Sequence, residues 1–329
     1  MHRKTRQHRR VNASCYAARV APPTDRILVT GANGKLGRRL LQRLCNAEPS
    51  TPARALVRSR RAADSLADLS AKAGFEVRVA DYADTQAMVE VAQGCTAAIH
   101  LVGILKETRD NRYAAAHEQT ARALAAAADA ARLRRIVHTS IHGADPSSEN
   151  PCLASRGHSD TILLAARTPA LILRVPMVLG AGDAASAALK RAVLSGGALL
   201  VGGGKSLEQP IAARDVVAAL CAGLDGPGLD DCVLELAGPE SLSHRALLER
   251  AARLLGRQIR FRTLPTSLAR AGAYLAEKLL AEPPITRAML GVLQHDDRVD
   301  AAPAARALGI DLSPLDDALR ECLAPEEAA

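Results

Sequence analysis

Short apolar runs alternate with amphipathic stretches along most of this chain of 329 residues. Between the runs the apolar spacing changes to a helical period, most clearly in the alanine-rich stretch 114–132. Strands and helices in this alternation predict an α/β fold with a doubly wound parallel sheet, which binds ligands at the carboxyl ends of its strands. The predicted strands lie at residues 26–30, 53–58, 75–80, 97–103, 135–140 and 170–175.

The pattern changes after residue 180. Residues 209–220 predict a loop that enters a helix, and residues 232–238 predict a strand that returns to the sheet. Residues 241–323 then read as mostly helical, with one strand near 259–263. We therefore expect a nucleotide-binding domain over 26–180 and a smaller, mostly helical lobe over 181–329, from which residues 209–238 return to the sheet.

One helix of this lobe is open to two interpretations. Residues 266–282, TSLARAGAYLAEKLLAE, have the spacing of an amphipathic helix. The favoured interpretation is a helix whose apolar side faces the core. The alternative is a helix that lies on a membrane surface or a partner protein.

The net charge of +8 is concentrated at the amino-terminal end. Residues 1–26 contain seven Lys or Arg and one acid, so about +6 of the charge lies there. We expect residues 1–25 to be a basic, disordered leader or an over-extended start; a targeting segment or nucleic-acid arm is the alternative. No apolar run approaches the ~18 residues of a membrane span. An aromatic content of 2% leaves few platforms for stacking bases, so nucleic acid is not expected as the main partner.

Seven cysteines occur without CxxC or other metal-ligand spacing. An odd number without such spacing favours a reduced, intracellular protein with buried thiols. We expect no metal site.

The first predicted strand runs into a glycine-rich turn, TGANGKLG, and then a helix. Gly31 permits the tight turn, Gly34 lets the backbone approach a pyrophosphate, and Gly37 packs the helix on the strand. This is the Rossmann arrangement, in which free amides of the helix amino terminus bind the phosphate. Its other expected cofactor contacts are Asn33, Lys35 and Leu36.

The end of the second strand indicates which dinucleotide binds. An acid there binds the ribose 2′-hydroxyl, whereas arginine accommodates a 2′-phosphate. The chain has Arg58 at this point, then Arg60 and Arg61, so NADP is favoured over NAD, unless these arginines are merely a solvated helix start. After the third strand, Asp81 is expected to accept from the adenine amino group beside Tyr82. Asp84, by contrast, is expected to cap the next helix.

Over roughly residues 26–323 the chain resembles the atypical or extended short-chain dehydrogenase/reductases. The motifs that carry the resemblance are TGANGKLG, RALVR, VADYAD, AAIHLVGI and LILRVPMVLGAGD. Within this superfamily the chain is most similar to the NAD(P)H-binding accessory subunit of respiratory complex I and its bacterial relatives. The similarity lies in His117, the GADPSS loop, the segment GGGK followed by QP, and the ending ARALGIDLSPLDDALRECL. The resemblance implies a cytoplasmic protein, peripheral at the inner membrane, with a membrane-associated respiratory or quinone-related complex as partner. It also implies cofactor contacts from Leu101, Val102, Gly103, Ser140, Arg156, Pro176 and Val178.

The catalytic motif of that family is altered. Family members end the fifth strand with Ser or Thr, here Ser140, and follow it with a Tyr-x-x-x-Lys pair, which falls on Cys152 and Arg156. Arg156 keeps a positive charge for the ribose. The Cys152 thiol is too short to bring a proton within the ~2.6–3.2 Å that general acid catalysis needs. A bystander thiol is therefore favoured over a nucleophile, and Tyr113 is the one other tyrosine with a suitable position.

Two functional hypotheses follow. The first is an NAD(P)H-binding protein with little or no reductase activity, acting as a redox, sensing or assembly component. The second is an active oxidoreductase or epimerase that uses Ser140 and a non-tyrosine donor on a hydrophobic, quinone-like or lipid-like substrate.

Overall fold

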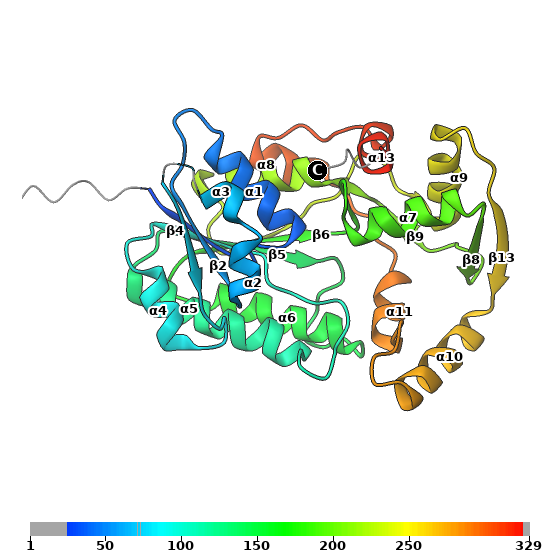
Figure 1. Ribbon diagram of the computed structural model, residues 1–329, viewed down its shortest axis with the longest axis horizontal. Coiled ribbons are helices and arrows are strands. Elements are labelled where there is room, and N and C mark those ends of the chain that lie inside the picture. Colours follow the sequence, from blue (N-terminus) through cyan, green and yellow to red (C-terminus); the bar gives the residue numbers. More distant parts are fainter. Residues whose placement is uncertain (1–24, 71, 73, 325–329) are drawn as a thin grey trace, which may run out of the picture.

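A seven-stranded parallel sheet forms the centre of the computed structural model, which describes residues 25–324 apart from 71 and 73 (Figure 1). Its strand order is β3-β2-β1-β4-β5-β6-β11, with every neighbouring pair parallel. The predicted doubly wound α/β fold is thus confirmed, and the strand predicted at 232–238 forms the sheet edge beside β6. The strands are β1 (Ile27–Thr30), β2 (Ala53–Val57), β3 (Phe75–Val79), β4 (Ala97–His100), β5 (Ile136–Ile141), β6 (Ala170–Val175) and β11 (Cys232–Glu235).

Helices cover both faces of the sheet (Figure 1). One face carries α1 (Lys35–Cys45), α2 (Arg60–Asp64), α3 (Ala67–Ser70) and α8 (Ala213–Asp225). The other carries α4 (Thr85–Ala92), α5 (Thr120–Ala131) and α6 (Pro151–Leu164).

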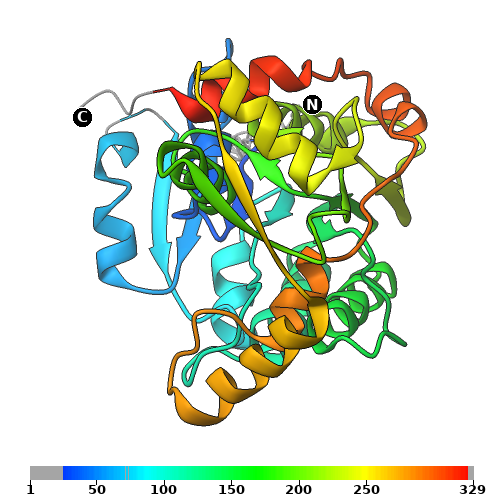
Figure 2. The same ribbon diagram turned by 90° about the vertical axis from the view of Figure 1, so that its right-hand side faces the viewer.

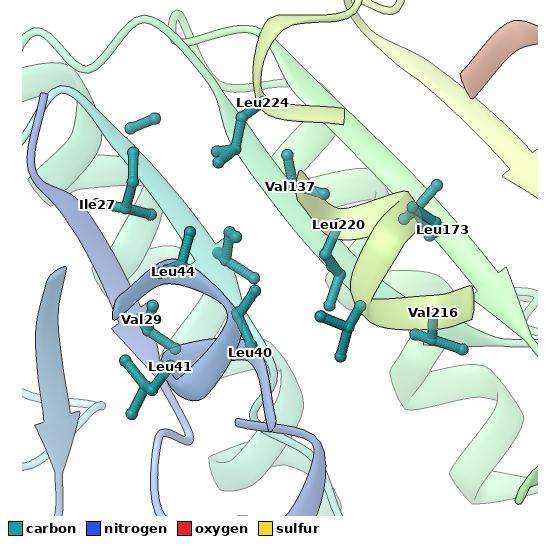
Figure 3. Packing of buried hydrophobic residues seen from close by; sticks show 14 of the residues in the cluster. Ile27, Val29, Leu40, Leu41, Leu44, Val137, Leu173, Val216, Leu220 and Leu224 are labelled. Carbon is teal, nitrogen blue, oxygen red and sulfur yellow. The ribbon is translucent and has the colours of Figure 1, made fainter. Parts of the chain in front are cut away.

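Alternate residues of the central strands supply two separate cores. Ile27 and Val29 of β1 pack with Leu40 of α1 and Leu220 of α8, as Figure 3 shows. Leu28, between them, points to the opposite face and joins the core under α4 and α5. Because successive side chains of a strand point to opposite faces, a strand covered on both sides must be apolar throughout. Each buried leucine contributes about 1.5–3 kcal/mol to stability.

The stretch predicted as one helix over 114–132 is two elements. Residues Ala114–Gln119 form a π-helical segment, η1, which continues directly into α5. A π-helical turn adds one residue per turn, which shifts side chains around the helix axis, and such turns are frequent at functional sites. It places His117 inward, with its side chain buried.

A third apolar core lies between α7 (Ala184–Leu194), α9 (His244–Leu254) and α13 (Leu315–Leu323). The predicted strand near 259–263 is confirmed as β13 (Arg260–Leu264), which pairs with β8 (Gly197–Val201). The shorter strands are β7 (Val178–Leu179), β9 (Leu207–Glu208), β10 (Ile211–Ala212) and β12 (Leu242–Ser243). Two short helices return to the sheet: α11 (Arg287–Leu293) contacts α6, and α12 (Ala302–Leu308) packs on α8, where Ala304 and Leu308 join the core under α1 and α8.

The favoured interpretation of residues 266–282 is wrong. They form α10 (Thr266–Leu279), which extends from β13 at the margin of the molecule (Figures 1 and 2). Ala273 is its one buried residue, while Leu268, Leu275 and Leu279 are exposed. Periodicity revealed an apolar side, but it carries no information on whether a tertiary neighbour covers that side.

None of the helices in the described part of the chain is long and apolar enough to cross a membrane. The basic leader expected over residues 1–25 lies outside the described residues except for Asp25.

Candidate cofactor and active site

The glycine-rich turn leaves no room for side chains on its inner side. Gly31 has a φ of +70°, and a Cβ there would lie 3.0 Å from the Leu101 carbonyl carbon. At Gly37 a Cβ would lie 2.6 Å from the Gly31 carbonyl oxygen, so α1 packs against the turn itself. Positive φ and close backbone contact both favour glycine.

The outer side of the same turn is open. Asn33, Gly34 and Lys35 are exposed, and α1 begins at Lys35 with no side chain capping its first turn. The first amides of a helix have no intrahelical acceptor and carry the positive end of its dipole. The turn therefore has the shape and polarity that a pyrophosphate requires.

Tyr82 is hydrogen-bonded to the backbone of this turn. Its hydroxyl accepts a hydrogen bond from the Gly31 amide at 3.2 Å and donates one to the Leu56 carbonyl at 3.0 Å. The ring is buried, and burial raises the pKa of the phenol. Tyr82 thus joins β1, β2 and the loop after β3, a role that the sequence did not indicate.

Arginines surround the end of β2. Arg58 is exposed, with its guanidinium carbon 5.9 Å from the centre of the Tyr82 ring. Within the described part of the chain, neither Arg58 nor the exposed Arg60 and Arg61 has an acidic ion-pair partner. Nearby, Asp81 accepts a hydrogen bond from the Ala83 amide at 3.0 Å. Asp84 caps α4 as predicted, accepting from the Ala87 amide.

Arg156 reaches from α6 to the loop that follows β4. Its Nη1 donates to the carbonyl oxygens of Val102 and Thr139, each at 3.3 Å. Burial lowers the pKa of the guanidinium, and Nε has no hydrogen-bond partner among the described residues. A buried cation with spare donors is costly unless an acceptor binds it.

Cys152 lies one turn before Arg156, in a first turn that Asn150 caps by accepting from the Cys152 and Leu153 amides. The residue is 0% exposed, and its Sγ lies 3.8 Å from the Ile104 carbonyl oxygen. Burial raises the pKa of the thiol. A neutral, inaccessible thiol is a poor nucleophile.

Tyr113 fills the space next to that thiol. Its hydroxyl donates to the Leu105 carbonyl at 2.9 Å and lies within hydrogen-bonding reach of Cys152. Burial and the neighbouring thiol raise the pKa of the phenol. The ring also stacks on His117, with centroids 5.6 Å apart.

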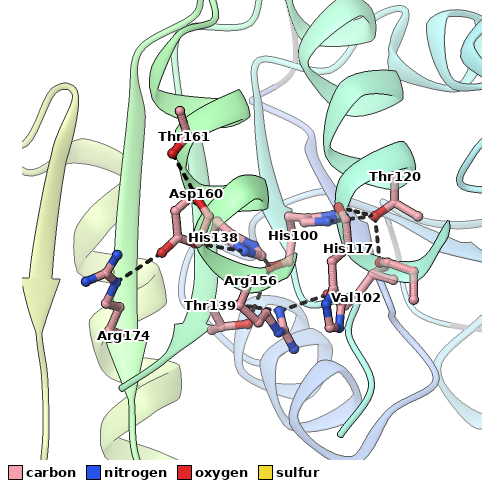
Figure 4. Close-up of polar contacts among 12 residues, drawn as sticks. His100, Val102, His117, Thr120, His138, Thr139, Arg156, Asp160, Thr161 and Arg174 are labelled. Atoms are coloured by element: carbon pink, nitrogen blue, oxygen red, sulfur yellow. Dashed lines mark hydrogen bonds and ion pairs between the residues drawn. The ribbon is translucent and has the colours of Figure 1, made fainter. Parts of the chain in front are cut away.

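A row of buried polar side chains runs under the carboxyl ends of the strands (Figure 4). Thr30 Oγ1 and His100 Nδ1 are 2.7 Å apart, and His138 Nδ1 donates to the His100 carbonyl at 3.1 Å. His138 Nε2 lies 3.8 Å from Asp160 Oδ1, and Asp160 accepts from Arg174 Nε at 3.0 Å. Burial, with a smaller contribution from nearby Arg156, lowers the pKa of His100 to about 3.

Ser140 belongs to this row. Its side chain is buried beside Asp160, whose pKa is raised by burial despite the neighbouring serine and Arg174. No hydrogen bond among the described residues joins Ser140 to Cys152 or Arg156. A signal for this row was present in the sequence: His100 ends the apolar run of β4, and His138 begins a polar stretch within β5.

The segment after β6 passes the amino terminus of α1. Pro176 and Val178 are partly exposed there, and Val178 begins β7. Arg39 of α1 ties this segment down through Asp183, with Nη1 2.9 Å from the carboxylate.

A cleft of about 990 Å³ adjoins Tyr113. One wall comes from residues 107–113 and the start of α6, and the other from α10 and α11. Leu153, Leu280 and Pro283 make it partly apolar, while Arg109 and Arg270 line it without ion-pair partners in the described residues. Its two walls are more than 100 residues apart in the chain, so sequence patterns did not predict it.

Residues 31–174 match the family model described as NAD(P)H-binding. Ceramide reductase of Caulobacter vibrioides is 29% identical over 239 residues, which are 73% of this chain and 73% of that protein. The mitochondrial NADH dehydrogenase [ubiquinone] 1 alpha subcomplex subunit 9 of Arabidopsis thaliana is 29% identical over 251 residues, 74% of this chain and 61% of that protein.

Among solved structures, an NADPH-dependent quinone oxidoreductase of Escherichia coli in complex with NADPH superimposes with a TM-score of 0.68. It is 22% identical, and the match covers 89% of this chain and 98% of that one. The chain therefore contains an NAD(P)H-binding domain with a Rossmann-type fold. Its relatives include reductases and a complex I subunit, so the resemblance stated from the sequence is confirmed.

Proposed function

We propose that the chain binds NADPH, with the pyrophosphate over the glycine-rich turn. Gly34, exposed and at the amino terminus of α1, supports this position, and Asn33, Lys35 and Leu36 flank it. The tight inner packing of Gly31 and Gly37 holds the turn in the required shape.

The choice of NADPH over NADH rests on Arg58. Three exposed arginines without acidic partners at the end of β2 are suited to a 2′-phosphate, which arginine binds with two parallel hydrogen bonds. No acidic side chain occupies the position where NAD-binding proteins hold the ribose. Asp81 and Tyr82 would then lie on the adenine side.

The nicotinamide half would lie along the loop after β4. Arg156 lies there, with Nη1 bound to the Val102 and Thr139 carbonyls, and the rest of its guanidinium is suited to hold the ribose hydroxyls. We propose that the remaining contacts of this half come from Leu101, Val102, Gly103, Ser140, Pro176 and Val178. When bound, NADPH supplies a hydride; the chain supplies orientation and charge.

The burial of Cys152 carries the functional conclusion. At the position where related enzymes have a catalytic tyrosine, this chain has a fully buried thiol directed at a backbone carbonyl. We infer a weakly active or non-catalytic redox, sensing or assembly protein that binds its cofactor through Arg156. Isothermal titration with NADPH, followed by assays with carbonyl and quinone acceptors, tests this. Binding without turnover is expected, and turnover at ordinary enzymatic rates would overturn it.

A second candidate is an active oxidoreductase or epimerase on a hydrophobic, quinone-like or lipid-like substrate. The position of Tyr113 favours it, because this phenol borders both Cys152 and the large cleft. In that case Tyr113→Phe abolishes turnover and leaves NADPH affinity unchanged, while Ser140→Ala reduces turnover. If Tyr113→Phe leaves the rate unchanged, this tyrosine is not the proton donor.

We further propose a cytoplasmic protein, peripheral at the inner membrane, that associates with a respiratory or quinone-related complex. The similarity to a subunit of mitochondrial NADH dehydrogenase supports this partner class. Isolation of membranes at low and high salt, followed by detection of the chain, tests the location.

A further inference from the structure

Helix α10 carries a stripe of exposed leucines. Leu268, Leu275 and Leu279 are 59%, 55% and 78% exposed. Their spacing of seven and four residues places them on one side of the helix. Ala273, the helix's one buried residue, lies on the opposite side. A contiguous apolar stripe of this kind on a protein surface marks an interaction site more often than chance exposure.

The charges next to the leucine stripe are of one sign. From Arg250 to Ala276 the chain contains six arginines and no acid. Arg257, Arg260 and Arg262 are exposed and have no ion-pair partner among the described residues. The last two belong to β13, which leads directly into α10 along the same margin of the molecule (Figures 1 and 2).

The acids nearest to the stripe lie elsewhere. Glu277 faces the cleft and is paired with Arg287 at 2.8 Å, and Glu282 follows the end of the helix. Lys278 flanks the leucines and lies 5.8 Å from the Tyr274 ring, over which Arg287 also lies, at 4.9 Å. An amphipathic helix with a leucine side, basic flanks and no acid on that side has the composition of an interfacial helix.

We propose that the leucine stripe and the β13 arginines dock on an anionic phospholipid bilayer, with α10 in the plane of the headgroups. The charge pattern favours lipid over a second copy of this chain, because a second copy would oppose arginines with arginines. Phosphate headgroups instead attract each exposed basic residue near the surface. This inference deepens the proposed peripheral location and rests on it.

Docking in this orientation has a consequence for the site. The side of α10 opposite the leucine stripe lines the large cleft through Arg270 and Glu277, and Leu280 follows at its rim. The cleft that borders Tyr113 would therefore lie next to the membrane.

Co-sedimentation of the full chain with vesicles tests the proposal. Phosphatidylcholine vesicles containing 30% phosphatidylglycerol should bind the protein at least tenfold more strongly than pure phosphatidylcholine. Raising the salt concentration should weaken binding, since surface charges are screened. Failure of the wild-type chain to bind the anionic vesicles overturns the proposal.

Two double variants separate the contributions. Leu275→Glu with Leu279→Glu should lower binding to anionic vesicles at least tenfold, and Arg260→Glu with Arg262→Glu should remove the preference for phosphatidylglycerol. The matched control is Leu194→Glu, a comparably exposed leucine on α7 at 47%, which should bind like the wild type. NADPH titration on every variant shows that the cofactor domain is folded.

Two further outcomes would overturn the lipid proposal, and a third would overturn the proposed cofactor function. If the wild type is a dimer that the leucine variants make monomeric, a second copy covers the stripe and the lipid proposal fails. Equal vesicle binding by the wild type and both double variants also overturns it. Vesicle binding without NADPH binding would leave this inference standing and remove the proposed cofactor function instead.

Discussion

The guanidinium of Arg156 lies against the backbone of Gly103: a Cβ added to Gly103 would come within 1.7 Å of Nη2. The same guanidinium donates to the Val102 and Thr139 carbonyls. The side chain that replaces the family's lysine is therefore held at the carboxyl ends of β4 and β5, where a doubly wound sheet binds its ligand.

The affinity for NADPH should depend more on the positive charge of the side chain at position 156 than on its shape. We expect Arg156→Lys to keep NADPH affinity within about tenfold, or roughly 1.4 kcal/mol, because an ammonium still binds ribose hydroxyls. Arg156→Met should lose more than that, since it removes every donor. Isothermal titration measures both. Equal affinities for Arg156→Met and the wild type would place the nicotinamide half elsewhere.

Gly34 should be essential for the cofactor and dispensable for the fold. Its φ of −66° and ψ of 161° are accessible to any residue, and a Cβ would lie 3.2 Å from the Gly31 oxygen. We expect Gly34→Val to lower NADPH affinity at least about a hundredfold, or 2.8 kcal/mol, by filling the space of the pyrophosphate. Gly272→Val, where a Cβ meets nothing within 4 Å, is the control. A folded Gly34→Val variant with normal affinity would contradict the cofactor site.

Arg58 should discriminate between the two dinucleotides. Arg58→Ala is expected to weaken NADPH about tenfold or more and NADH much less, because only NADPH carries the 2′-phosphate. Arg167→Ala, another exposed arginine, is the control. Equal losses for both cofactors would remove the case for NADPH.

The Cys152 thiol should be inert. Because burial raises its pKa, the thiolate forms at a higher pH than that of an ordinary cysteine. In the native protein, iodoacetamide at pH 7.5 should label the half-buried Cys45 before Cys152, as peptide mass mapping would reveal. Cys152→Ala should change neither NADPH affinity nor residual turnover. A large loss of turnover with binding intact would make the thiol catalytic.

The buried histidines should make folding sensitive to acid. The pKa of His100 is about 3 in the folded chain and near 6.5 when unfolded, so the neutral form stabilises the fold above pH 6.5. That stabilisation is lost as the pH falls from 6.5 towards 3, at about 1.4 kcal/mol per pH unit for each such histidine. Denaturant unfolding at pH 7.0 and 5.5 measures it, and His100→Gln should remove about 1.2 kcal/mol of the difference in unfolding free energy between the two pH values. An unchanged slope would mean that folding does not lower the pKa of His100.

Local sequence patterns were sufficient to predict the parallel sheet and the glycine-rich turn. A strand covered on both faces is mostly apolar, so strands such as β1 and β6 are visible in the sequence. Gly31 and Gly37 are required by backbone geometry within a few residues of each other, and such requirements can be read from spacing alone. The replacement of a tyrosine by Cys152 was equally local.

Tertiary structure decided what depends on contacts between distant segments. Three features join residues that are dozens to more than a hundred positions apart in the chain. They are the hydrogen bond of Tyr82 with Gly31, the contact of Tyr113 with Cys152, and the cleft between α6 and α10. The apolar side of α10 shows the limit most clearly. Periodicity establishes that a helix has such a side, but only the position of the neighbouring elements determines whether that side is buried or, as for Leu275, left exposed.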